Sequence, residues 1–244
     1  MTPAALRTLI AADARILWRD PLLVWMTAMP IGMALLIRVV VRAIENLTAA
    51  SSFDLTPYHP LIMGGYLMSA PGMIGFVIGF LLLDERDAGT LRALRVTPLS
   101  MREYLVYRIT GPVLVGTVST MVGYPLTGLT PIAAATLFPI AAVASIAAPL
   151  LALVLAAASP NKVAGFAVVK VLNSVNLLPI AAYFAPLPLQ YAAGIVPTYW
   201  PMRALWSAAA GQPYLHFLGA GVLIGTAAVA LAAIVWNRRL RRRA

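Results

Sequence analysis

Cysteine is absent from this chain, and charged residues are scarce. Without cysteine the sequence offers neither a disulfide framework nor a thiol for metal or redox chemistry. Cysteine usage therefore does not indicate whether the protein lies in an oxidising or a reducing compartment. Only 11% of the 244 residues are charged, whereas soluble domains carry about 25%. This inventory excludes a water-soluble globular protein, because it cannot supply a hydrated surface.

Hydrophobic residues make up 61% of the chain, and its mean hydropathy is +0.87. No lipid can satisfy a backbone N–H or C=O, so membrane-spanning segments are helices unless they alternate as barrel strands do. The runs 132–158 and 219–236 are apolar on every face and do not alternate. The sequence therefore predicts an all-α membrane protein.

Six segments are long enough to cross about 30 Å of hydrocarbon. The predicted spans, within one transmembrane domain over 1–244, are 22–41, 60–83, 104–126, 131–158, 163–184 and 214–236. A further helix is predicted over 3–19, where Leu6 and Ile10 fall on one side and Arg15 on the other, as in a helix that lies in the membrane interface. The alternative is that it extends the first span. It lacks the apolar core and cleavage site of a signal peptide, so we expect it to be retained.

Glycine and proline mark two further features. Gly72, Gly75 and Gly79 recur at spacings of three and four, which lets another helix, of this chain or of a partner subunit, approach closely. The stretch 185–213 holds five prolines and is too interrupted to span as one straight helix. Short external or re-entrant segments are expected there.

The formal net charge of +10 raises the question of nucleic-acid binding. The charges lie in short segments between spans, which is typical of the positive-inside bias. With both termini in the cytoplasm, the external segments hold only Arg38, Arg42 and Arg203, Lys170 lies within the fifth span, and every other basic residue is cytoplasmic. We therefore expect cytoplasmic termini and no nucleic-acid partner. Arg38 and Arg42 end the first span, from where their side chains can reach the headgroups.

An intramembrane enzyme would need paired carboxylates or histidines within the spans. All acidic residues fall in predicted loops or interfacial segments, and His59 and His216 fall near external span ends without a facing carboxylate or cysteine. The enzyme is therefore the weaker alternative, and no catalytic, cofactor or metal site is expected on this chain.

The stretch 84–103 is the most charged segment in the middle of the chain. Residues 90–96 can form a short helix with Leu91 and Leu94 on one side, which the following Thr-Pro would end. Its other side carries Arg92 and Arg95. A short amphipathic helix between two long spans suits docking into the groove of a soluble partner. The alternative from the residues alone is an ordinary solvated loop.

Two segments carry a resemblance to a known family. Residues 85–100, Glu-Arg-Asp-Ala-Gly-Thr-Leu-Arg-Ala-Leu-Arg-Val-Thr-Pro-Leu-Ser, closely resemble the signature after the second span of ATP-binding-cassette (ABC) type 2 permeases. Residues 196–206, Val-Pro-Thr-Tyr-Trp-Pro-Met-Arg-Ala-Leu-Trp, are similar to the proline and aromatic segment before the last span of these permeases. The length, the number of spans and the N-terminal helix are similar too. The external loops are short, so the chain departs from members with large extracellular domains.

The resemblance implies the permease subunit of an exporter in the bacterial cytoplasmic (inner) membrane. In the family, the segment after the second span is a coupling helix that docks on a nucleotide-binding subunit. The coupling residues would be Glu85, Gly89, Thr90, Leu91, Arg92, Leu94 and Arg95. Because the chain has no G-x-x-x-x-G-K-[ST] phosphate loop, ATP and Mg would be bound by that separate subunit. The alternative is a permease that works without ATP. That alternative does not explain why the Gly-Thr-Leu motif is present at 89–91.

The family further implies a dimer with an identical or related permease copy, and a substrate path between the copies. Lys170, Asn173 and Asn176 form a polar stripe on the fifth span and are candidates for that path. A charge at such depth costs about 2.5–3.5 kcal/mol on insertion scales, so Lys170 should face water, a carbonyl or an anion, unless it reaches the cytoplasmic headgroups. The apolar interior suits an amphipathic small molecule, such as a drug, an antibiotic or a lipid-like species, and export is the usual direction in the family.

Overall fold

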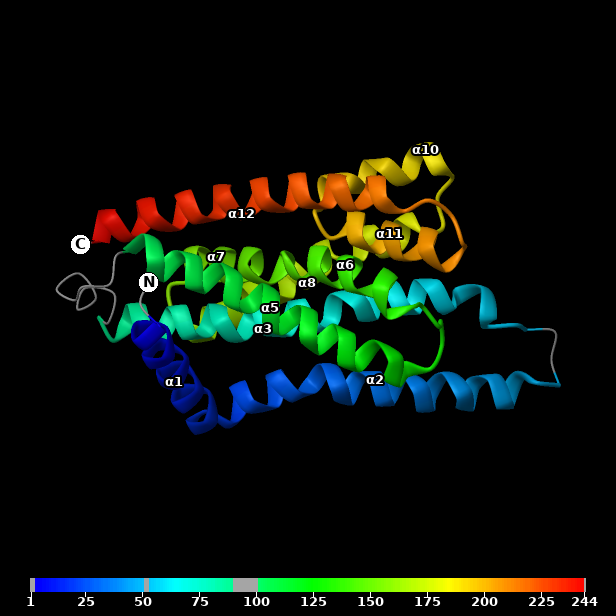
Figure 1. Ribbon diagram of the computed structural model, residues 1–244, viewed down its shortest axis with the longest axis horizontal. Coiled ribbons are helices and arrows are strands. Elements are labelled where there is room, and N and C mark those ends of the chain that lie inside the picture. Colours follow the sequence, from blue (N-terminus) through cyan, green and yellow to red (C-terminus); the bar gives the residue numbers. More distant parts are fainter. Residues whose placement is uncertain (1–2, 51–52, 90–100, 244) are drawn as a thin grey trace.

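The computed structural model describes residues 3–50, 53–89 and 101–243, and the regular elements in these ranges are all helical. Six helical segments are long and apolar enough to span a membrane: Pro21–Thr48, Thr56–Asp87, Glu103–Thr127, Ala134–Ala158, Lys162–Ala182 and Leu215–Arg239. The prediction of an all-α membrane protein is thus confirmed. The predicted coupling helix over 90–96 lies outside the described residues. The N- and C-terminal ends lie at the same end of the bundle, called the terminal end below (Figure 1).

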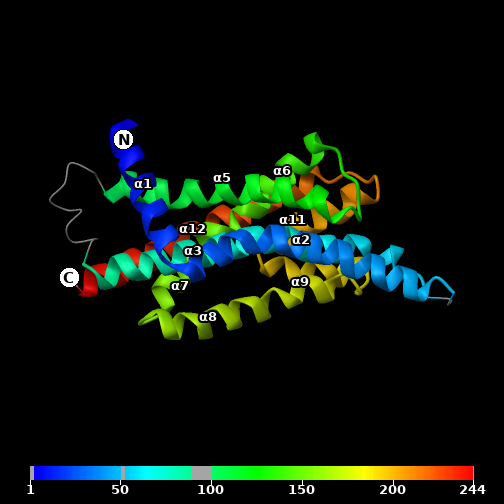
Figure 2. The ribbon, with the colours of Figure 1, turned by 90° about the horizontal axis from the view of Figure 1, so that it is seen from below.

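The first two helices meet at Asp20, between α1 (Pro3–Arg19) and α2 (Pro21–Thr48). The Asp20 backbone is extended, and its carboxylate accepts a hydrogen bond from the Leu22 N–H at 3.0 Å. A proline then occupies the first position of α2, where its missing N–H costs no helical bond. As a result α1 does not continue α2 but crosses the direction of the long helices (Figures 1 and 2).

Helix α3 (His59–Asp87), which follows the 3-10 turn η1 (Thr56–Tyr58), lies at the centre, with 72% of its apolar window buried. Two of its glycines pack against α7 (Ala147–Ala158). A Cβ on Gly75 would lie 2.7 Å from the Ala148 carbonyl oxygen, and one on Gly79 would lie 2.6 Å from a Leu155 methyl carbon. A Cβ on Gly72 would meet open space. The close approach predicted from these glycines therefore occurs within this chain, at two of the three positions.

Two of the spans are pairs of helices, with the bounds α6 (Ala134–Ser145) and α7, and α8 (Lys162–Val175) and α9 (Leu177–Ala182). The interruptions, at Ile146 and Asn176, each come three residues before a proline, Pro149 and Pro179. A proline has no N–H for the carbonyl four residues earlier, and its ring crowds that carbonyl. The helix is therefore broken at that turn.

The proline-rich stretch 185–213 forms the short elements α10 (Leu187–Gln190), η3 (Tyr191–Ile195) and α11 (Tyr199–Ala209). Helix α11 is packed inside the bundle, at the end opposite the terminal end (Figure 1). Tyr199, Ala204 and Leu205 are fully buried there, against α12 (Leu215–Arg243), α3 and α6. As expected, the stretch forms short helical segments and not one straight helix.

Candidate functional site: a buried charge cluster at the terminal end

The segment predicted to couple the chain to an ATPase begins where α3 ends. Glu85 lies in the last turn of α3, and Gly89 follows the helix with φ +70, a left-handed conformation that glycine adopts without steric cost. The Gly89 N–H donates to the Arg86 carbonyl at 3.2 Å, a bond typical of glycine-terminated helices. The other predicted coupling residues lie outside the described residues and their role stays a prediction: Thr90, Leu91, Arg92, Leu94 and Arg95.

Glu85 points into the protein and is only 9% exposed. Its carboxylate accepts hydrogen bonds from the Tyr104 hydroxyl and the Arg108 guanidinium, both near the start of α5 (Met101–Thr127). Tyr104 and Arg108 are four residues apart, so they share one helix face, and Arg108 Nε donates to the Tyr104 hydroxyl at 3.1 Å. The two helices that flank the predicted coupling segment are therefore joined directly.

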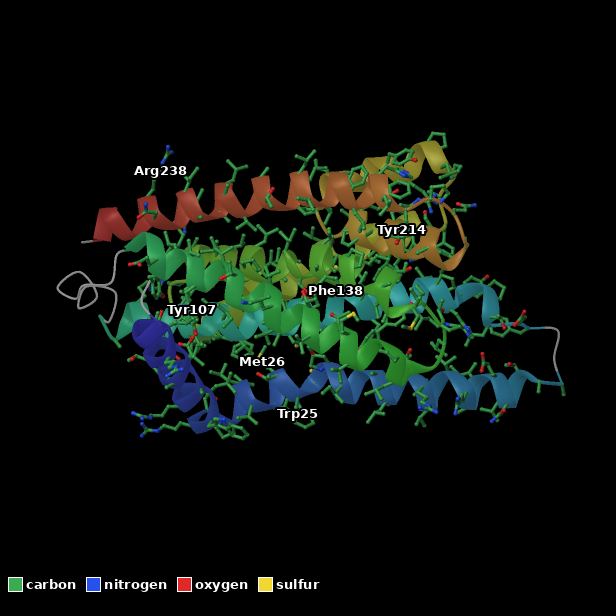
Figure 3. The ribbon with its side chains drawn as sticks, in the orientation of Figure 1. Trp25, Met26, Tyr107, Phe138, Tyr214 and Arg238 are labelled. Carbon is green, nitrogen blue, oxygen red and sulfur yellow. The ribbon has the colours of Figure 1, made fainter. Side chains whose placement is uncertain are left out.

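Helix α1 joins the same group through Asp13. Arg108 Nη1 lies 2.7 Å from Asp13 Oδ2, and Arg108 Nη2 lies 3.0 Å from Asp13 Oδ1, which makes a bidentate ion pair. The Tyr107 hydroxyl donates to Asp13 Oδ2 at 2.7 Å, and Figure 3 shows Tyr107 beside α1. We call Asp13, Glu85, Tyr104, Tyr107 and Arg108 the Arg108 cluster.

The Arg108 cluster is buried, so the loss of one of its charged partners is costly. Arg108 is 3% exposed, and its guanidinium carbon lies 5.3 Å from the Tyr104 ring centre and 5.5 Å from the Tyr107 ring centre, within cation–π range. Removing one partner of a buried ion pair costs about 3–5 kcal/mol, because the remaining charge is left uncompensated. The cluster therefore connects the middle of α1 to the last turn of α3 and the first turns of α5.

Arginines also bind the end of α7. Arg86 of α3 donates to the carbonyls of Ser159 at 2.8 Å and Pro160 at 2.6 Å, and Arg239 of α12 donates to the carbonyl of Ala157. The last carbonyls of a helix lack helical partners and carry partial negative charge, so cations are favourable there. These contacts tie α3 and α12 to α7.

Lys162, the first residue of α8, links two further helices to α3. Its Nζ lies 2.8 Å from Asp84 Oδ2 at the end of α3 and 3.4 Å from Asp20 Oδ2 at the start of α2. In the described residues, charged side chains thus connect α2 and α8 to α3, and α3 and α12 to α7.

The predicted path residues lie on the span Lys162–Ala182, in which 11% of the apolar window is buried. Lys170 and Asn173 are on α8, and Asn176 is at the break between α8 and α9. Lys170 and Asn173 are exposed on its surface, whereas the Asn176 side chain accepts a hydrogen bond from the Thr198 hydroxyl at 2.7 Å. The structure thus leaves two of the three exposed and gives the third a partner from the stretch before α11. Their role in a transport path stays a prediction.

The prediction that His59 lacks a facing carboxylate is wrong. The Nε2 atom of His59 lies 2.8 Å from Glu45 Oε1. The reason is that α2 continues as far as Thr48, beyond the predicted end of the first span, and so carries Glu45 back to the start of α3. In the described ranges no group of three His, Cys, Asp or Glu side chains is arranged to hold a metal ion.

The sequence analysis does not predict the Arg108 cluster, because its charged members lie on three different helices. One signal was present in the sequence. Arg108 falls inside the predicted span 104–126, where a charge needs a partner, and Tyr104 precedes it by one helical turn.

Comparison with known proteins identifies the family. The model of the Rv2686c-like family, described as fluoroquinolones export permease protein Rv2686c-like, matches residues 13–233. The chain belongs to this family. Two relatives are the fluoroquinolones export permease proteins MT2760 of Mycobacterium tuberculosis (strain CDC 1551 / Oshkosh) and Rv2686c of Mycobacterium tuberculosis (strain ATCC 25618 / H37Rv). Each is 34% identical over 241 residues, which cover 96% of this chain and 92% of the relative.

The Rv2686c-like match bears on both the fold and the site. It covers Asp13, Glu85 and Arg108, the charged members of the Arg108 cluster. It is consistent with the resemblance to ABC type 2 permeases, and with the six spans it makes this chain a multi-pass membrane protein of a permease family. A permease is a transport subunit and not an enzyme.

Proposed function

We propose that this chain is the permease subunit of an ABC exporter that moves an amphipathic antibiotic, of the fluoroquinolone class, out of the cytoplasm. The observation that carries the proposal is 34% identity over 92% of two relatives named fluoroquinolones export permease proteins. The chain has no phosphate loop, so ATP and Mg are bound by a separate nucleotide-binding subunit.

The Arg108 cluster supplies a route for coupling. Of the predicted coupling residues, Glu85 lies in α3 and the others fall between α3 and α5, and the cluster ties both helices to α1. When ATP closes the partner subunits, a push on this segment moves α1, α3 and α5 together. Leu91 and Leu94 give apolar docking, and Arg92 and Arg95 fix the orientation at the rim.

Charge and burial support the proposed orientation and the proposed permease partner. Both ends of the chain lie at the terminal end (Figure 2), and most basic residues fall on that side, which by the positive-inside bias is the cytoplasmic face of the inner membrane. In α2 and α8 only 22% and 11% of the apolar windows are buried. Their exposed faces are available to a second permease copy, identical or related, as well as to lipid.

The test is export from a bacterium that lacks its own drug pumps. The chain is expressed with and without a candidate ATPase subunit, and the fluoroquinolone retained by the cells is measured by its fluorescence. We expect lower accumulation only when both subunits are present. Export by the chain alone, abolished by an ionophore that dissipates the proton gradient, would instead establish an ATP-independent transporter.

A matched pair of variants locates the docking segment. Leu91→Asp with Leu94→Asp should abolish both co-purification of the ATPase and export. Leu47→Asp, at an 84% exposed position near the far end of α2, makes one substitution of the same kind and should leave both intact. Co-purification that survives the double substitution would contradict the docking assignment.

A further inference from the structure

A cleft of about 530 Å³ opens between α1, α2, α3 and α5, next to the Arg108 cluster. Sites for drug-sized molecules are commonly about 300–1,000 Å³. Most of its wall is apolar, for example Ile10 of α1, Ile74 of α3 and Leu114 of α5. The hydroxyls of Thr27 and Thr110 are bonded to carbonyls of their own helices and add little polarity.

Asp13, Tyr107 and Arg108 form the polar part of the wall. Asp13 and Arg108 form an ion pair in this wall. Arg108 uses four of its five N–H groups on Asp13, Glu85 and Tyr104. The polar wall therefore has few free donors.

Asp13 keeps capacity for another donor. A carboxylate has about four lone-pair sites, and the described contacts use three, two on Oδ2 and one on Oδ1. The Asp13 side chain is 15% exposed and lines the cleft. A protonated amine placed there would donate to this free acceptor site in a charge-assisted hydrogen bond.

Apolar side chains at the edge of the cleft show where a ligand enters. Ile10 is 50% exposed and Leu114 67% exposed, so the rim offers an apolar surface to lipid. Because α1 crosses the bundle at this point (Figure 1), the opening lies where an interfacial helix would meet the bilayer. An amphipathic molecule partitioned into the bilayer can reach the cleft sideways.

We propose that this cleft binds an amphipathic amine that enters from the bilayer, with its apolar body between α1 and α5 and its ammonium group on Asp13. This inference rests on the proposed function, and it names the site where the exported molecule is first captured.

Binding is measured without any ATPase, on the purified chain in nanodiscs of phosphatidylcholine and phosphatidylglycerol. The probe is ciprofloxacin, which carries a protonated piperazine nitrogen, and the matched ligand is its N-acetyl derivative, which lacks that charge. We expect ciprofloxacin to bind about tenfold more tightly than the derivative, as for one charge-assisted hydrogen bond. Equal affinities would overturn the assignment of Asp13.

Gly111→Leu tests the location, because Gly111 lines the cleft and an added Cβ would have its nearest neighbour, Tyr107, at 4.0 Å. The added Cβ has room, the rest of the leucine side chain takes up space in the cleft, and the substitution should weaken ciprofloxacin binding at least about tenfold. Gly219→Leu on α12, where an added Cβ also meets open space, is the control and should bind as the wild type does. Wild-type binding by Gly111→Leu would overturn the proposal, and so would displacement of the probe by added phosphatidylethanolamine, which would make the cleft a lipid site.

The two proposals fail separately. Loss of binding by Gly111→Leu with normal export in cells would reject this capture site and leave the export function standing. Normal binding with no export under any ATPase partner would reject the export function. Asp13→Asn should also weaken ciprofloxacin binding. If that variant fails to fold, the binding measured with Gly111→Leu still tests the location of the site.

Discussion

Replacing Arg108 by methionine would test whether the Arg108 cluster holds the terminal end together. Arg108 donates twice to Asp13 and once each to Glu85 and Tyr104. Methionine keeps an unbranched apolar side chain but offers no donor. After the change, two carboxylates would remain in a buried site, with only tyrosine hydroxyls as partners.

The expected loss in the free energy of unfolding is about 3–5 kcal/mol, the usual cost of removing one partner of a buried ion pair. Adding Glu85→Gln removes one of the two stranded charges. We therefore expect the double variant to recover part of the loss, on the order of 1–2 kcal/mol. In the wild-type background, Glu85→Gln alone should cost about 1–3 kcal/mol.

The assay is reversible unfolding by dodecyl sulfate in mixed micelles, followed by circular dichroism. Arg42→Met is the control, because Arg42 is an exposed arginine near the opposite end of α2, and it should change stability by less than about 1 kcal/mol. A loss below about 1 kcal/mol for Arg108→Met, or no recovery on adding Glu85→Gln, would refute the reasoning.

Other predictions concern packing and coupling. Gly75→Val should lower the free energy of unfolding by at least about 1–3 kcal/mol, because its Cβ would press on a carbonyl of α7. Gly72→Val should cost little, because its Cβ would face open space. The thermal stabilities of the two variants in detergent are compared. Arg86→Met should lose about 1.5–3 kcal/mol by releasing the end of α7, and unchanged stability would contradict that contact. Leu91→Asp with Leu94→Asp should leave membrane insertion intact and remove the ATPase from a pull-down.

Features that depend on one segment at a time were predictable from the sequence. Apolar runs longer than the bilayer requires give the spans, and the Asp20-Pro21 pair separates α1 from α2. The breaks before Pro149 and Pro179 have a local cause too, although the predicted bounds passed over them.

Features that depend on two or more helices were not predictable. Gly72 shares its spacing with Gly75, yet only Gly75 meets a neighbour, because spacing places residues on a face and does not say where the next helix lies. Likewise, Arg108 is separated from Asp13 by 95 positions and from Glu85 by 23. Helical periodicity relates positions within a helix, so it could not pair these three charges.

The interruption at Ile146 divides one span into two helices that share α3, α5 and α12 as neighbours but differ at their outer ends. Arg86 and Arg239 hold α7 at the terminal end, whereas α6 also packs against α11. Because Pro149 cannot donate to the Ser145 carbonyl, flexing at this joint breaks no hydrogen bond between them. A rotation of α7 at the terminal end is therefore partly taken up by bending at Ile146. Helix α6, toward the opposite end, moves only by the remaining part of that rotation.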